Sequence, residues 1–326
     1  MNKEQEFISA LAEIFKPSTE LLVGIGDDAA VVTQMKQNVV ASADMAIEGV
    51  HFKNEWSSKF QIGAKTATAN IADIFAMGAQ PKYLLVSAGL PVDTKLESVR
   101  ELALGIKSVA DRFSVHVIGG DITRSANLVL SISAIGQVET PILRSGAEVN
   151  DYIFVTGLTG WSALGLSILQ QTPADKGATQ KISDLLQNNG PVLAHLNPYL
   201  VSPSKLFPYI NSLTDISDGL VMDLASIATN SGVTMTLDSK SLAKLPGFDE
   251  FNELAKLYGE IGLELILQGG EDHLFIGTIS EENLTKLQNE KVSDSIFIIG
   301  KVKSFDGENQ VLLDGKRQSE GGFKHF

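Results

Sequence analysis

The spacing of apolar residues predicts alternating helices and strands over residues 1–140. Apolar side chains recur every three or four positions in 4–15 and 96–113, which is the period of a helix with one buried face. An alanine-rich run over 62–77 predicts a third helix, which stops at Gly78. Residues 128–134 alternate as a half-buried strand does. Four shorter apolar runs predict further strands, at 29–33, 39–43, 82–90 and 115–118.

A second series of elements follows a domain boundary that we expect near Thr140-Pro141. A helix is predicted near 161–170, and a passage rich in Pro, Asn and Gly comes after it. Another helix begins just after Asp218 and stops at Gly232, because glycine readily ends a helix. Strands are predicted at 152–156, 263–267, 274–279, 296–302 and 310–313. The pattern predicts an α/β protein with two domains, 1–139 and 140–326.

Composition limits the class of protein. The 326 residues are 44% apolar and 20% charged, as in globular chains, and no apolar run is long enough to span a membrane. The first residues lack the basic-then-apolar order of a signal peptide, so we expect a cytoplasmic protein. The absence of cysteine excludes disulfides, thiolate nucleophiles and iron–sulfur clusters. A net charge of −13 disfavours nucleic acid and acidic membranes as partners, so an anionic substrate would need bound cations or a local basic patch.

Acidic residues, most of them beside glycines, recur along the whole chain. They lie at Gly26-Asp27-Asp28, Asp44, Asp73, Gly119-Gly120-Asp121, Asp215-Ile216-Ser217-Asp218-Gly219 and Gly269-Gly270-Glu271-Asp272. Two carboxylates about 4 Å apart repel by roughly 4 kcal/mol at an effective dielectric constant near 20, so a fold that gathers them needs a cation. Oxygen-only ligands favour Mg²⁺, and glycine lets backbone N–H groups approach phosphate oxygens. The clusters therefore indicate a site for Mg²⁺ and a polyphosphate.

Each motif also has a simpler structural interpretation. A lone Gly-Asp pair is more often a turn than a ligand, and Ser217 or Asp218 could simply cap a helix. His51 could be a structural histidine, and Arg144 taken alone is a surface charge. The acidic clusters carry more weight because they end apolar strands or lie in apolar helices, where an unpaired charge is costly. No P-loop, protein-kinase motif set or dinucleotide-binding glycine turn occurs, so the phosphate site must be built differently.

As a set, the motifs resemble the thiamine-monophosphate kinase family. The resemblance covers nearly the full length and rests on residues 24–29, 42–45, 48–52, 70–74, 76–79, 119–121, 144–147, 215–220, 269–272 and 322–326. The Gly-Asp-Asp and Ser-Asp-Gly elements alone would indicate only the wider superfamily of aminoimidazole-ribonucleotide synthetase-like ATP enzymes. Glu-Gly-Val-His-Phe at 48–52 and Gly-Phe-Lys-His-Phe at 322–326 favour the thiamine kinase within it.

The resemblance implies transfer of the ATP γ-phosphate to thiamine monophosphate by direct in-line displacement, with no covalent phosphoenzyme. Such a transfer needs positioning and charge neutralisation more than a protein nucleophile. It implies several Mg²⁺ ions at Asp28, Ser42, Asp44, Asp73, Asp121, Asp215 and Asp218, with one ion shared by Asp44 and Asp121. It implies an ATP site at Gly120, Asp121, Arg144 and Ser217. It implies a thiamine phosphate site at His51, Glu271 and Phe323.

The resemblance also implies a PurM-like fold, with an N-terminal α/β domain, a C-terminal α+β domain and ATP in the cleft between them. Strands of the N-terminal domain are expected to form a barrel across the two-fold axis of a homodimer, which would pair their edges. Four positions depart from the family pattern, where threonine, serine, glycine and tyrosine are common: Ala43, Ala72, Asn150 and His273. None of these departures removes a carboxylate.

Other classes of protein remain open. A related ATP-dependent cyclo-ligase or amidine synthase would share the fold and the aspartates, and assays with aminoimidazole precursors would separate it. Selenophosphate synthesis and hydrogenase maturation are disfavoured, because those relatives rely on cysteines that this chain lacks. A non-catalytic module that binds Mg²⁺ and nucleotide would bind ATP without consuming it.

Overall fold

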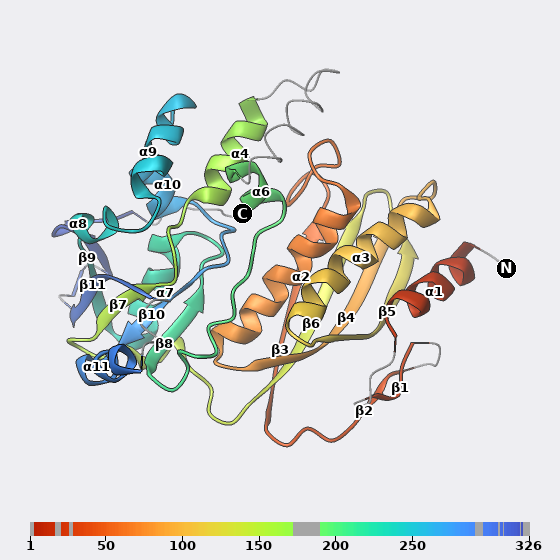
Figure 1. Ribbon diagram of the computed structural model, residues 1–326, viewed down its shortest axis with the longest axis horizontal. Coiled ribbons are helices and arrows are strands. Elements are labelled where there is room, and N and C mark those ends of the chain that lie inside the picture. The colour runs from red at the N-terminus through yellow and green to blue at the C-terminus, as the bar shows by residue number, and fades with distance from the viewer. Residues whose placement is uncertain are drawn as a thin grey trace. The chain divides into compact units, whose positions relative to one another are not determined.

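The protein is a mixed α/β structure made of two compact units (Figure 1). The computed structural model describes residues 3–16, 21–25, 29–171, 190–290, 296–305, 307–308, 310–319 and 321. The first unit comprises Met1–Phe75 with Ala79–Thr140, and the second comprises Ala76–Gly78 with Pro141–Phe326. No helix in the described ranges has the length and apolar character that crossing a membrane requires.

The first unit is built on a four-stranded sheet with the order β3-β6-β4-β5. The last strand of this unit in the sequence, β6, therefore lies between β3 and β4, and both pairings are antiparallel. Only β4 and β5 pair in parallel within this sheet. The elements are α1 (Lys3–Ile14), β1 (Leu21–Val23), β2 (Val31–Val32), β3 (Asn38–Ile47), α2 (Lys59–Ala76), β4 (Gln80–Leu90), α3 (Leu96–Arg112), β5 (His116–Arg124) and β6 (Val129–Val138).

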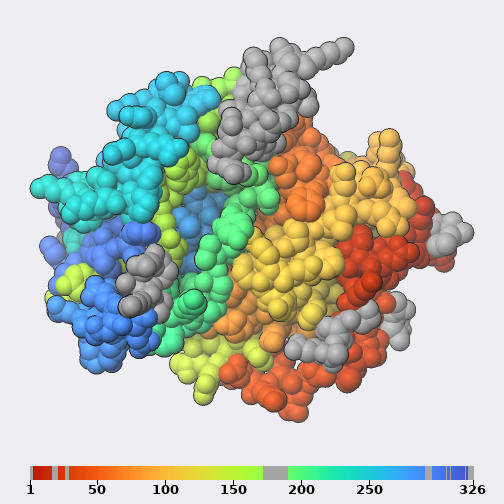
Figure 2. Space-filling view, viewed as in Figure 1, coloured from red at the N-terminus to blue at the C-terminus, as the bar shows by residue number. Residues whose placement is uncertain are grey.

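Two helices, α2 and α3, cover one face of this sheet, as Figure 1 shows in orange and yellow-orange. The same colours form the near surface of this unit in Figure 2. The predicted apolar stripe of α3 is confirmed, since Leu102 and Ile106 are almost fully buried. The helices approach closely at two glycines. A Cβ atom on Gly63 would lie 2.1 Å from the Leu102 carbonyl oxygen, and one on Gly105 would lie 2.0 Å from the Phe60 carbonyl oxygen. Glycine is therefore required at both positions by packing.

Within the residues that the structure describes, the other face of the sheet is partly open. Burial alternates strictly along β6, as the sequence predicts for a half-buried strand. On the face away from the helices, Val39 and Met45 of β3 are 61% and 52% exposed, and Leu85 of β4 is also exposed. The register places these three side chains on one face, because they pair with Gln137, Ser131 and Ser133 of β6. Among the described residues, the first unit thus presents a partly exposed, partly apolar sheet face, which we call the open face.

The second unit contains a seven-stranded sheet, within the described residues, with the order β13-β12-β9-β11-β7-β10-β8. Neighbouring strands are antiparallel except β12 and β9. The elements are η1 (Arg144–Gly146), β7 (Tyr152–Val155), α4 (Trp161–Gln171), α6 (Pro191–Leu196), β8 (Ile210–Asp215), α7 (Leu220–Ser231), β9 (Val233–Leu237), α8 (Ser239–Leu242), α9 (Phe248–Leu257), α10 (Gly262–Gln268), β10 (Phe275–Ile279), α11 (Glu281–Asn289), β11 (Phe297–Ser304), β12 (Val311–Leu313) and β13 (Lys316–Arg317).

The structure confirms some local predictions and overturns one. The helix after Asp218 ends at Gly232, whose φ of 66° is left-handed, as a glycine stop requires. The strand predicted at 263–267 is wrong, because these residues belong to α10. A run of five apolar residues fits a strand and a buried helix equally well. In the structure the Leu265 N–H donates to the Ile261 carbonyl and the Gly269 N–H donates to the Leu265 carbonyl, which is the hydrogen-bond pattern of a helix. Asn150 has a φ of 79°, a left-handed conformation that glycine adopts more readily than residues with side chains.

Candidate active site

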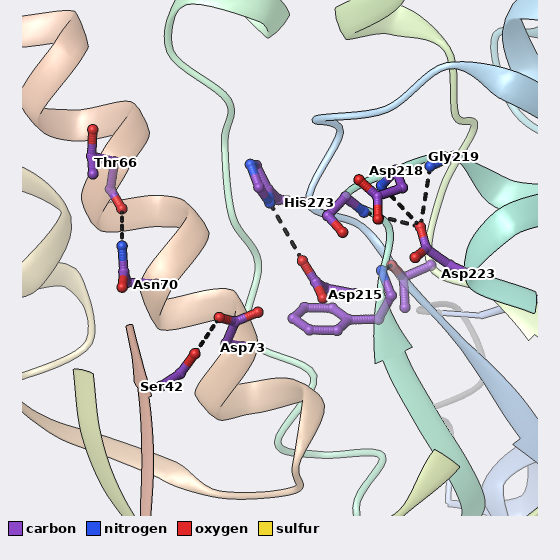
Figure 3. Close-up of polar contacts among 12 residues, drawn as sticks. Ser42, Thr66, Asn70, Asp73, Asp215, Asp218, Gly219, Asp223 and His273 are labelled. Carbon is purple, nitrogen blue, oxygen red and sulfur yellow. Dashed lines mark hydrogen bonds and ion pairs between the residues drawn. The ribbon is translucent and has the colours of Figure 1, made fainter. Parts of the chain in front are cut away.

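In the first unit, three predicted metal residues lie where β3 meets α2. The Ser42 hydroxyl donates a hydrogen bond to Asp73 Oδ2 at 2.5 Å. The Asp44 backbone N–H donates to Asn70 Oδ1 at 3.1 Å, and Asn70 Nδ2 donates to the Thr66 carbonyl at 2.9 Å (Figure 3). Asn70 is fully buried, so its amide is held in one orientation. The helix thereby fixes the strand that carries Ser42 and Asp44.

Asp121 lies elsewhere on the same sheet. Across the sheet, Asp44 on β3 pairs with Ile132 on β6, Ile132 pairs with Val86 on β4, and Val86 pairs with Gly120 on β5. Three strand spacings correspond to about 14 Å. Paired residues share a face and successive residues alternate, so Asp121 faces the open side, opposite to Asp44. Within one copy of the chain, Asp44 and Asp121 therefore lie on opposite faces of the sheet and three strands apart, and the predicted sharing of one ion by these two residues stays a prediction.

A cavity of about 1430 Å³ lies beside Asp121 in the first unit. Its lining includes Ser87 and the polar side chains of Glu48 and Lys59, together with the Gly119-Gly120 backbone. The volume exceeds the usual range of small-molecule sites, about 300–1,000 Å³. Gly120 also has a packing role, because a Cβ atom there would lie 1.7 Å from the Val86 carbonyl oxygen. The cavity beside Asp121 is therefore lined by both apolar and polar residues.

His51 lies in the segment that follows β3, and its ring is oriented by the backbone. Its Nδ1 accepts a hydrogen bond from the Ile47 N–H at 3.1 Å, which in the neutral ring leaves the proton on Nε2. Glu48 and Lys59 are linked through the Asn54 side-chain amide by two short hydrogen bonds. Burial lowers the pKa of Lys59, and the charge of Glu48 opposes that shift. No motif in the sequence indicated that Asn54 and Lys59 hold the Glu48 side chain in this way.

In the second unit, the loop between β8 and α7 carries Asp215, Ser217 and Asp218. Asp215 is 3% exposed at the end of β8. The Ser217 carbonyl accepts from the Glu271 N–H at 2.8 Å. The approach is close enough to need glycine, because a Cβ atom on Gly270 would lie 2.4 Å from the Ser217 carbonyl oxygen. The turn at 269–273 therefore packs directly against the loop.

Asp223, in the first turn of α7, organises the same loop from the other side. Its Oδ2 accepts hydrogen bonds from the N–H groups of Ser217, Asp218 and Gly219 at 3.1, 3.2 and 3.2 Å (Figure 3). Burial, together with the charges of Asp215 and Asp218, raises the pKa of Asp223 to about 7, although these N–H groups oppose the shift. Sequence reasoning missed Asp223. The available signal was a lone carboxylate within the apolar start of a helix.

Asp272 fixes the turn at 269–273 to the beginning of α4. Its two carboxylate oxygens accept from the Gly160 N–H at 2.6 Å and the Ser162 N–H at 3.0 Å. Unpaired N–H groups at a helix N-terminus favour such an anion. Burial nevertheless raises the pKa of Asp272 to about 6, against the effect of these N–H groups. The sequence marked Asp272 as part of an acidic cluster and assigned it no role.

The residues on either side of Asp272 contact different parts of the unit. Glu271 Oε2 lies 3.4 Å from Nδ1 of His195, a buried residue of α6 whose Nδ1 is also 3.1 Å from the Ser162 hydroxyl. His273 Nδ1 lies 3.5 Å from Asp215 Oδ2 (Figure 3). Glu271 and His273 have φ values of 62° and 50°, an uncommon conformation for residues with side chains. The turn therefore places Glu271 against α6 and His273 against the end of β8.

Arg144 lies in η1, and its exposed guanidinium donates to the Ser226 hydroxyl of α7 at 3.3 Å. Its carbonyl accepts from the Ser231 hydroxyl at 2.8 Å, so α7 holds both ends of this residue. The last two predicted site residues, Asp28 and Phe323, lie outside the described residues.

The donors that the structure describes are compatible with Mg²⁺. Among the described residues, no group of three or more His, Asp or Glu side chains is arranged to hold a metal by itself. Mg²⁺ is usually bound by one or two carboxylates together with waters and substrate phosphates, so smaller groups of oxygen ligands fit it. Ser42 with Asp73 is such a group, and Asp215 and Asp218 both lie close enough to Asp223 for their charges to act on it.

Comparisons with known proteins identify the class of enzyme to which this fold and these loops belong. Residues 26–138 match the family described as AIR synthase related protein, N-terminal domain. The chain is 31% identical over 316 residues to the thiamine-monophosphate kinase of Aquifex aeolicus (strain VF5), a match that covers 97% of each chain. The chain belongs to the thiamine-monophosphate kinase family.

Solved structures agree with this assignment. The crystal structure of thiamine-monophosphate kinase from Stenotrophomonas maltophilia K279a is similar with a TM-score of 0.82 and 30% identity, covering 97% of this chain and 98% of that one. A structure of AaThiL complexed with AMPPCP and TMP is similar with a TM-score of 0.75 and 28% identity, covering 100% of this chain and 99% of that one. The similarity therefore extends over both units.

Proposed function

We propose that this protein transfers the γ-phosphate of ATP to thiamine monophosphate and releases thiamine diphosphate and ADP. The observation that carries the proposal is the nearly full-length match to thiamine-monophosphate kinases, one of which was solved with AMPPCP and TMP. An oxygen of the substrate phosphate attacks the γ-phosphorus, and the bond between that phosphorus and the β–γ bridging oxygen breaks. The bridging oxygen leaves with ADP. The protein's task is to align the two phosphates and compensate their charge.

The site residues divide these tasks. Gly120, Asp121, Arg144 and Ser217 bind ATP in this proposal, and His51, Glu271 and Phe323 bind thiamine monophosphate. His51 suits its role, because the backbone N–H of Ile47 donates to its Nδ1 and so orients the ring. Arg144 supplies an exposed guanidinium, which pairs with phosphate through two parallel hydrogen bonds.

Mg²⁺ fits the oxygen ligands at Asp28, Ser42, Asp44, Asp73, Asp121, Asp215 and Asp218, and when bound would neutralise the charge that develops on the transferred phosphoryl group. The chain's own contribution is to hold these carboxylates in place. Asn70 and α2 do so for Asp44 and Asp73, and Asp223 does so for Asp218.

A coupled assay for ADP release tests the reaction. We expect ADP release to depend on thiamine monophosphate and on Mg²⁺, with thiamine diphosphate formed in equal amount. ADP release that depends on an aminoimidazole precursor instead would assign the chain to a related ATP-dependent synthase. ATP binding with no release of ADP under any of these conditions would favour a non-catalytic nucleotide-binding module.

We further propose that the enzyme is a homodimer in which the open sheet face of the first unit pairs with a second copy to form a barrel. The exposed Val39, Met45 and Leu85 on that face support burial against a partner. The positions of Asp44 and Asp121 add a second argument. They lie on the two edge strands of one sheet, β3 and β5, about 14 Å apart, and a barrel closed by edge pairing would bring β3 of one copy beside β5 of the other, so we propose that an ion shared by Asp44 and Asp121 joins two copies.

Complementation between two inactive variants tests this arrangement. Asp44→Asn and Asp121→Asn would be co-expressed with different affinity tags, and the heterodimer purified by both tags. A shared site leaves one of the two sites with both aspartates, so the heterodimer should recover about half of wild-type activity. No activity above that of the parent variants would place Asp44 and Asp121 in the site of a single copy. A monomer in sedimentation, active at sub-micromolar concentration, would contradict the dimer itself.

A further inference from the structure

The backbone amides of the loop at 217–219 are engaged within the protein. All three N–H groups donate to a single atom, Asp223 Oδ2, at 3.1–3.2 Å. Successive N–H groups that converge in this way form an anion-binding concavity, and here the anion is a side chain of the same chain. The contact extends the usual capping box, in which a side chain of the first turn reaches back to the N-cap N–H alone. Asp223 is 5% exposed, so water competes little for these bonds.

The opposite side of the loop is held as well. The carbonyl oxygens of Ile216 and Ser217 accept from the N–H groups of His273 and Glu271, at 3.1 and 2.8 Å. Gly219 adopts a φ of 129°, and a Cβ atom there would lie 2.7 Å from the Gln268 carbonyl oxygen. The backbone of the loop is therefore fixed between α7 and the turn at 269–273. This leaves side chains, rather than amides, as the groups with which the loop can bind a ligand.

We propose that Asp223 is a positioning residue for nucleotide binding, which fixes the backbone of 217–219 and so holds the side chains of Ser217 and Asp218 in their binding orientation. The inference rests on the proposed function only in taking the ligand to be a nucleoside triphosphate. It assigns Asp223 no contact with that ligand. In this arrangement the Gly219 N–H donates to Asp223 rather than to a phosphate.

The hydrogen-bond geometry predicts different effects for two substitutions of Asp223. One oxygen makes all three bonds, so Asp223→Asn can place its amide oxygen there and keep the acceptor. Asp223→Ala removes the acceptor and leaves three N–H groups without it. A matched control is Asp238, which accepts from the Ser241 N–H at 3.0 Å at the start of α8 in the same unit. Asp238→Ala removes a helix-capping aspartate that has no link to 217–219.

The test measures the dissociation constant of AMPPCP with Mg²⁺ by calorimetry, without thiamine monophosphate, together with the melting temperature. We expect Asp223→Ala to weaken AMPPCP at least tenfold, Asp223→Asn to stay within threefold of wild type, and Asp238→Ala to leave the affinity unchanged. Wild-type affinity in Asp223→Ala would overturn the proposal. An equal loss of AMPPCP affinity in Asp223→Asn and Asp223→Ala would overturn it too, because the charge of Asp223, rather than its acceptor oxygen, would then determine binding.

Steady-state kinetics add a readout that a purely structural role would not move. We expect Asp223→Ala to raise the KM for ATP while the KM for thiamine monophosphate stays within twofold. Parallel increases in both KM values with a lower melting temperature would reduce Asp223 to a folding residue and overturn the proposal. If wild-type enzyme releases no ADP with thiamine monophosphate, the proposed function fails, and the AMPPCP measurement still decides the role of Asp223.

Discussion

Asp272 gives the most quantitative prediction. Its pKa is raised from 3.8 to about 6, chiefly by burial. The folded protein therefore holds this proton more tightly than the unfolded chain does, so the stabilisation is complete below pH 3.8 and is lost as the pH rises towards 6. One pKa unit corresponds to about 1.4 kcal/mol, so the loss amounts to about 3 kcal/mol at most, and less to the extent that solvent reaches the carboxylate.

The perturbation is Asp272→Asn, which removes the titration. The asparagine has one acceptor oxygen for the N–H groups of Gly160 and Ser162, so one of these donors loses its partner at every pH, at a cost of about 1–3 kcal/mol. The variant should be less stable than wild type near pH 4. Between pH 4 and pH 7 it should gain up to about 3 kcal/mol relative to wild type, which closes or reverses the difference.

Urea unfolding followed by Trp161 fluorescence measures this difference. Trp161 begins α4 between the two N–H donors and contacts Phe251 edge-on, with ring centroids 4.9 Å apart. The chain has two tryptophans, so a Trp56→Phe background restricts the signal to the second unit, which matters because two units need not unfold together.

The control is Asp238→Asn, because the pKa of Asp238 is shifted in the opposite direction. A hydrogen bond from Ser241 lowers that pKa, so Asp238 stabilises the fold above its unfolded pKa and loses that effect as the pH falls. Asp238→Asn should therefore lose stability relative to wild type as the pH rises. A difference between wild type and Asp272→Asn that stays flat from pH 4 to 7, or that follows the Asp238→Asn trend, would refute the reasoning.

Three further substitutions test packing, ligand binding and backbone conformation. Gly105→Ala should destabilise the first unit by about 1–3 kcal/mol in urea, because its Cβ would lie 2.0 Å from the Phe60 carbonyl oxygen, whereas Gly24→Ala, with no atom within 4 Å, should not. Arg144→Ala should raise the KM for ATP more than that for thiamine monophosphate at an unchanged melting temperature, and equal increases would point to a general electrostatic role. Asn150→Ala should cost about 1 kcal/mol in thermal unfolding and Asn150→Gly about 0.5 kcal/mol or less, because the backbone there has a φ of 79°.

Local patterns in the sequence were sufficient for much of the fold. The helices near 62–77 and 96–113 and the alternating strand at 128–134 follow directly from apolar spacing, and the structure has α2, α3 and β6 at these places. The strand predicted at 263–267 is wrong, because a run of five apolar residues is too short to show whether its period is that of a strand or of a helix. The short helix α6 was missed in a passage whose composition indicated only loop.

The candidate site was predictable as a set of residue types but not as a geometry. Alternation along a strand gives the face of each residue relative to its neighbours, and it does not give the order of strands. The insertion of β6 between β3 and β4 separates Asp44 from Asp121, and no local pattern contains that information. Asp223 and Asp272 were unassigned for a related reason, since their partners are backbone N–H groups, which no sequence motif reveals.

The position of β6 also sets the order in which the first unit can form during synthesis. In the four-stranded sheet β3 pairs only with β6, so 81 residues, 48–128, must be translated before its partner strand begins. At about 5–20 residues per second this takes roughly 4–16 s, during which Val39 and Met45 lie on an unpaired strand. Nascent chains that stop before Val129 should therefore bind chaperones or aggregate, and chains that extend past Val138 should be released from both.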